Sequence, residues 1–99
     1  MSKVITIDPG KRKCGLVLAE ISEKKVYMAI IIKSELIGEY VRNLNTVEDI
    51  SKIIIGNGTT SREIKQKLDF FKKEIITYEE KILLIELRRD ISNFFQLMV

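Results

Sequence analysis

The sequence predicts an α/β fold in which helices flank a mixed five-stranded sheet, with the elements in the order βββαβαβα. Three observations lead to this prediction. Short β-branched segments recur along the chain, two of them end in glycine-containing turns, and the apolar residues between the later ones change to helical spacing. The chain has 99 residues, of which 45% are hydrophobic and 31% charged, so we expect one compact domain over residues 1–99.

The first three strands are expected to form an antiparallel meander. Their aliphatic cores are residues 3–7, 14–19 and 26–32. The turn Asp8-Pro9-Gly10 follows the first strand, because proline fixes one backbone dihedral and glycine tolerates positive φ. Since the first strand is apolar almost throughout, we expect it to be buried on both faces of the sheet. Short connections between these strands favour antiparallel pairing.

Helices are expected to separate the later strands. Apolar residues at helical spacing between Glu35 and Thr46 predict the first helix, and the spacing of Thr60 and Glu63 predicts a capping box that opens the second. The second helix is expected to continue toward Lys72. Two short strands at 52–55 and 74–78 and a C-terminal amphipathic helix over 84–98 complete the order. Strands separated by helices should join the sheet in parallel, through right-handed crossovers.

The composition excludes several kinds of chemistry. The chain has no histidine and one cysteine, Cys14, which removes Ser-His and Cys-His nucleophile pairs and the usual zinc and non-haem iron sites. Catalysis would therefore rest on carboxylates, lysine, arginine, hydroxyls or backbone. Carboxylate oxygens suit hard cations such as Mg²⁺ or Mn²⁺. The net charge of +3 adds a mild preference for polyanionic partners.

The sequence gives no indication of membrane attachment. No apolar run approaches the ~20 residues that span a bilayer, and the first residues lack the apolar stretch of a signal peptide. We therefore expect no membrane partner and a cytoplasmic location. A homodimer is expected if Phe94 and Met98 of the last helix are left uncovered.

Asp8 is the first candidate site residue. It follows the first strand directly, and ligands of open α/β sheets bind outside the carboxyl ends of the parallel strands. Asp8 could instead cap the turn by accepting hydrogen bonds from nearby amides. Gly10 and Gly15 favour a functional role, because a backbone without side chains can approach a phosphate closely. Arg12 and Lys13 can then lie along the phosphate chain.

Two motifs in this order carry a family resemblance. Residues 7–17, IDPGKRKCGLV, match the pattern D-x-G-x-[KR]-[KR]-x-G and resemble the opening of RNase H-like nucleases of the Holliday-junction resolvase group, of both the RuvC and the YqgF (RuvX) types. Residues 53–63, IIIGNGTTSRE, resemble the second YqgF motif. The resemblance covers nearly the whole chain. It implies an RNase H-like fold and a metal-dependent endonuclease that acts on pre-ribosomal RNA or branched DNA.

The resemblance also implies two further acidic residues. Glu80 aligns with the glutamate of the family's D-E-R motif after the last strand, and Asp90 aligns with the aspartate that opens the final helix. Together with Asp8 they are expected to be catalytic and to hold Mg²⁺ or Mn²⁺, which would activate water for phosphodiester hydrolysis.

Both acidic residues also have a structural interpretation. The negative charge of Glu80 could stabilise the amino end of a helix through the helix dipole, and Asp90 could lie on a solvent-exposed face. If residues 81–98 form one unbroken helix, a rise of ~1.5 Å per residue places Glu80 and Asp90 about 15 Å apart. The metal site then needs a turn at 82–85 or a partner subunit, or the set of carboxylates is incomplete.

The second motif is expected to bind phosphate. Gly56 and Asn57 would offer a backbone amide and a side-chain amide, and the helix that begins near Ser61 would offer its positive end. Arg62 could add a bidentate contact, although an ion pair with Glu63 is an equal alternative.

Two other function classes compete with a nuclease. An RNase H-like module that binds nucleic acid with an eroded catalytic set would fit the short segment before Asp90. An actin-like sugar kinase or ATPase shares the D-x-G turn, but 99 residues leave no room for its second phosphate-binding lobe. The nuclease is the first hypothesis.

Overall fold

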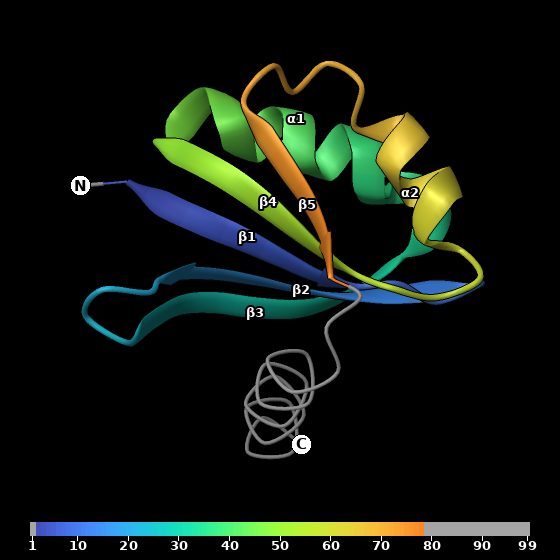
Figure 1. Ribbon diagram of the computed structural model, residues 1–99, viewed down its shortest axis with the longest axis horizontal. Helices are drawn as coiled ribbons and strands as arrows, with labels where there is room; N and C mark the ends of the chain where they lie inside the picture. The colour runs from blue at the N-terminus through green and yellow to red at the C-terminus, as the bar shows by residue number, and fades with distance from the viewer. Residues whose placement is uncertain (1, 79–99) are drawn as a thin grey trace.

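The strands form one mixed sheet in the order β3-β2-β1-β4-β5 (Figure 1). The computed structural model describes residues 2–78. The strands are β1 (Lys3–Asp8), β2 (Lys13–Glu20), β3 (Lys25–Lys33), β4 (Ile50–Gly56) and β5 (Glu74–Tyr78), and the helices are the 3-10 helix η1 (Ser34–Leu36), α1 (Ile37–Val47) and α2 (Ser61–Lys67). β1, β2 and β3 pair antiparallel, and β4 and β5 join in parallel. The predicted α/β fold class is confirmed.

The two α-helices, α1 and α2, pack on the same face of this sheet (Figure 1). The core between these helices and the sheet combines alternate residues of the central strands with the apolar faces of α1 and α2. Its fully buried members include Ile5, Ile7, Leu16, Ile53, Ile55, Ile37, Val41, Ile64 and Leu68. Because β1 and β4 lie at the centre of the sheet and end at the same edge, this core fixes the positions of both strand ends.

Residues of the opposite sheet face are also buried. Val4 and Thr6 in β1, Val17 in β2 and Ile54 in β4 are at most 6% exposed. The prediction that both faces of the first strand are buried is therefore confirmed.

Three details of the helices differ from the predictions. The 3-10 turn η1 precedes α1, so the first α-helix begins two residues later than expected. The Thr60 side chain makes no capping hydrogen bond, and the Ser61 hydroxyl instead donates to the Gly58 carbonyl at 2.8 Å. α2 ends at Lys67, because the Leu68 amide bonds to Lys65 in a tighter turn and ends the helical pattern before Lys72.

One predicted strand begins earlier than expected, and the predicted C-terminal helix is not among the residues that the structure describes. β4 begins at Ile50, two residues earlier than predicted, because the buried Ile50 pairs with Lys3 at the start of β1. The predicted helix over 84–98 lies outside the described residues. No helix within residues 2–78 is long and apolar enough to cross a membrane.

Replacing Thr6 by valine is expected to stabilise the fold by about 1 kcal/mol, measured as the free energy of unfolding in urea. The Thr6 hydroxyl is buried between Val17 and Ile54 of the neighbouring strands and has no hydrogen-bond partner among residues 2–78. Valine has nearly the same shape and leaves no polar atom unsatisfied. Thr46→Val is the control, because the exposed Thr46 hydroxyl donates to Asn43 and its loss gives no gain. Equal changes in the two variants would contradict this reasoning.

Candidate functional site

The carboxyl ends of the three parallel strands meet at one edge of the sheet. Asp8 ends β1, Gly56 ends β4 and Tyr78 ends β5. The residues before them are paired in register, Ile7 with Ile55, and Gly56 is itself paired with Tyr78. This arrangement places the two motifs of the sequence side by side, as the strand-end rule predicts.

The turn after β1 and the loop after β4 lie against each other. A Cβ atom added to Gly58 would lie 3.9 Å from Cγ of Pro9, an ordinary van der Waals distance. Residues 56–58 therefore border the turn that follows Asp8. The predicted site residues Asp8, Gly10, Gly56 and Asn57 thus belong to two adjacent segments.

The basic turn between β1 and β2 is held in place by Ser34 at the end of β3. The Ser34 hydroxyl donates to the Gly10 carbonyl at 2.7 Å, and the Ser34 amide donates to the Arg12 carbonyl at 2.8 Å. The sulfur of the buried Cys14 lies 3.2 Å from the same hydroxyl. Sequence reasoning missed Ser34 and gave Cys14 no part in the site. Together these contacts fix the backbone that carries Arg12 and Lys13.

Asp8 lines a cavity of about 320 Å³ at this edge. Its other lining residues are Pro9, Lys13, Cys14, Gly15 and Ile31. Gly15 is the partner of Asp8 in the β1–β2 pair and brings no side chain beside the carboxylate. A half-buried carboxylate and a lysine ammonium thus share one cavity. The cavity therefore presents one anionic and one cationic side chain to a ligand.

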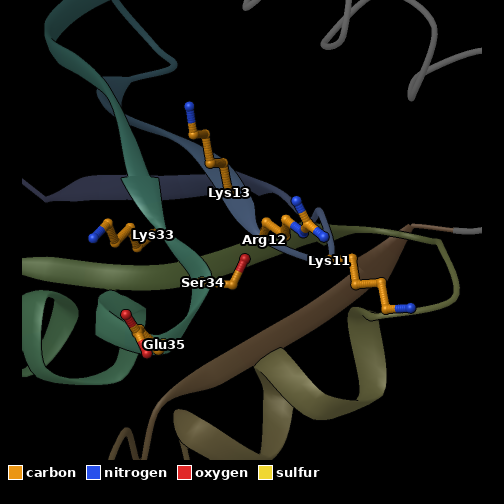
Figure 2. A pocket seen from close by; sticks show the side chains of 6 residues that line it. All are labelled: Lys11, Arg12, Lys13, Lys33, Ser34 and Glu35. Atoms are coloured by element: carbon orange, nitrogen blue, oxygen red, sulfur yellow. The ribbon is translucent and has the colours of Figure 1, made fainter.

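A second cavity of about 410 Å³ adjoins the first. Figure 2 shows its six lining residues: Lys11, Arg12, Lys13, Lys33, Ser34 and Glu35. Ser34 is buried at its base, whereas the four cationic side chains are exposed and spread outward from it. Lys13 lines both cavities. Lys11 and Lys33 were not among the predicted binding residues.

The predicted binding residues of the second motif differ in exposure. Gly56 is buried, while Asn57 and Arg62 are exposed, Arg62 in the first turn of α2. The Ser61 amide donates to the Gly58 carbonyl at 3.2 Å, and α2 has only seven residues. The Ser61 amide is therefore already used within the loop, and the positive end that the sequence predicted at this point belongs to a short helix.

Of the three predicted metal ligands, Asp8 is the one that the structure describes. Glu80 and Asp90 lie outside the described residues. Within residues 2–78, no group of three or more acidic, cysteine or histidine side chains could hold a metal ion. The described residues therefore do not by themselves complete a metal site.

Comparisons with known proteins support the fold. No family model and no curated protein matches the chain. The structure of Archaeoglobus fulgidus Pelota is similar to 89% of this chain, with a TM-score of 0.55 and 11% sequence identity. The type II variant of the Aquifex aeolicus Ppx/GppA phosphatase is similar to 78% of the chain, with a TM-score of 0.47 and 14% identity. A second structure of the Aquifex aeolicus member of the Ppx/GppA family is similar to 79% of the chain, with a TM-score of 0.43 and 11% identity. This chain spans 31% to 36% of their lengths. The likeness to Pelota shows the fold alone.

Proposed function

We propose that this chain binds structured nucleic acid, either pre-ribosomal RNA or branched DNA, and hydrolyses its phosphodiester bonds with the help of Mg²⁺ or Mn²⁺. One observation carries the proposal. Asp8 ends the central strand in a cavity that it shares with Lys13, and the loop 56–58 lies against the turn beside it. The resemblance of both motifs to RNase H-like nucleases of the YqgF type supports the same activity.

The chain's own residues would bind and orient the substrate. Arg12 and Lys13 are exposed on a turn whose backbone is fixed, so their charges stay close to the cavity of Asp8. Phosphate groups are the natural ligands of such cations. Asn57 and Arg62 would contact a neighbouring phosphate on the other side of Asp8, as the second motif predicts.

The carboxylate of Asp8 suits a hard divalent cation. Glu80 and Asp90 are the further ligands in this proposal. When held by carboxylates, such an ion neutralises charge on phosphoryl oxygens and makes bound water more acidic.

Cleavage of labelled structured RNA and four-way DNA junctions tests the proposal. With Mg²⁺ or Mn²⁺ we expect cleavage of at least one of them, and none in EDTA. Binding of both without cleavage in either metal would overturn the hydrolase and leave the nucleic-acid-binding module. Whichever of the two substrates is cleaved, the RNA or the DNA junction, identifies the substrate class.

A cytoplasmic location and a homodimer belong to the same proposal. The nucleic acids named above are cytoplasmic in cells without a nucleus, and Phe94 and Met98 would supply the dimer contact. Sedimentation equilibrium at high micromolar concentration measures the mass, and the mass of one chain would contradict the dimer.

A further inference from the structure

Charge is distributed unevenly between the two ends of the sheet. Among residues 2–78 the ion pairs are Lys3–Glu48, Lys52–Glu74 and Lys73–Asp49, and all lie toward the amino ends of β1, β4 and β5. The hydrogen bond with Glu48 raises the pKa of Lys3. At the opposite end of the sheet, where β1, β4 and β5 end, the 410 Å³ cavity is lined by four cationic residues that take part in none of these ion pairs: Lys11, Arg12, Lys13 and Lys33.

Two of these cations are placed directly opposite each other. Lys13 at the start of β2 is the register partner of Lys33 at the end of β3. Like charges directly opposite in an antiparallel pair destabilise a sheet. Arg12 is held beside them, because its carbonyl accepts the Ser34 amide. The fold therefore gathers positive charge at the ends of β2 and β3, and a bound anion would neutralise part of it.

The cavity has a fixed floor and a net positive charge. Ser34 is 6% exposed, and its hydroxyl and amide are both used to hold the turn. On the other side, Nζ of Lys67 donates to the Ser34 carbonyl at 3.0 Å and so fastens the end of α2 to the same residue. Four cations face one carboxylate, that of Glu35, around the cavity. The fixed backbone holds four cations around one cavity, where their charges attract an anion, and ordering their exposed side chains on binding offsets part of that attraction.

We propose that this cavity binds a second backbone phosphate, with Lys33 and Lys11 as binding residues in addition to Arg12 and Lys13. Lys13 lines both cavities, so a strand whose scissile phosphate lies at Asp8 would pass over Lys13 and cross the ends of β2 and β3. The identity of the ligand as nucleic acid rests on the proposed function. The path across β3 is the new element.

The test measures binding of a fluorescein-labelled RNA hairpin and a labelled four-way DNA junction by anisotropy, in EDTA, at several salt concentrations. Lys33→Gln is expected to weaken binding about fivefold at low salt and to lower the salt slope by about one. Lys72→Gln is the matched control, because it removes the same charge from an exposed lysine after α2 and leaves the slope unchanged. Glu35→Gln removes the one carboxylate of the cavity and is expected to tighten binding severalfold.

The outcomes separate this inference from the hydrolase. If Lys33→Gln and Lys72→Gln bind alike while the wild type cleaves, the path across β3 is wrong and the hydrolase stands. If the wild type does not cleave but binding depends on Lys33 and is tightened by Glu35→Gln, the phosphate site stands. Failure of the wild type to bind either probe would overturn both. Because Lys33 and Glu35 are exposed, both variants should fold, Lys33→Gln unfolding at or slightly above the wild-type temperature and Glu35→Gln at or slightly below it.

Discussion

Asp8→Asn is expected to lower the rate of metal-dependent cleavage about 1,000-fold or more. Asparagine keeps the shape of the side chain but removes the charge that the proposed reaction needs. Binding should persist or tighten slightly, because the neutral side chain no longer opposes a phosphate in the cavity shared with Lys13. Single-turnover cleavage and anisotropy on the same substrate measure the two effects separately.

Asp69→Asn is the matched control for this prediction. Asp69 is exposed and follows α2, well outside the two cavities, so the same change of charge should leave cleavage within about twofold. Equal cleavage by wild type and Asp8→Asn would contradict the catalytic role of Asp8. It would then favour the alternative in which Asp8 only caps the turn.

Three strands, two inside the sheet and one at its edge, were predictable because their pattern is local. The buried strand over 3–7, the short strand over 52–55 and the strand over 74–78 are marked by β-branched runs between polar turns, and all three exist within one or two residues of the predicted ends. Helix ends were less predictable. The choice between an α-helical and a tighter 3-10 turn at Leu68 and before Ile37 depends on packing, which the sequence does not display.

The candidate site was predictable where it follows from strand ends. Asp8 and the loop 56–58 come after neighbouring parallel strands, so their proximity follows from topology. Ser34 and Lys33 were missed, since they are more than 20 residues from the turn that they border. The register of the predicted meander was the signal that could have found them, because it pairs Lys13 with Lys33.

Gly10 was predicted for a reason that the structure corrects. We expected it to supply positive φ, but no glycine among residues 2–78 has positive φ. Its role is instead to permit close approach. A Cβ atom at this position would lie 2.1 Å from the Lys13 carbonyl oxygen, far inside van der Waals contact. The motif requires glycine here because the turn folds back on its own backbone.

Gly10→Ala is therefore expected to reduce the free energy of unfolding by at least about 2 kcal/mol and to weaken nucleic-acid binding. Neither side of the clash can move freely. The Gly10 carbonyl is held by Ser34, and Lys13 is paired with Lys33 in the sheet. Relief of the clash must break one of these contacts and displace the basic turn. Urea denaturation measures the stability, and anisotropy at fixed salt measures the binding.

Gly58→Ala supplies the comparison, because its added methyl would meet Pro9 at an ordinary 3.9 Å. We expect its stability to stay within about 0.5 kcal/mol of the wild type. Both substitutions lower the entropy of the unfolded chain by the same amount, so the difference between them isolates the clash in the folded state. Equal stabilities for the two variants would mean that the turn can relax without cost, and the fixed positions of Arg12 and Lys13 on which the phosphate site depends would then be lost.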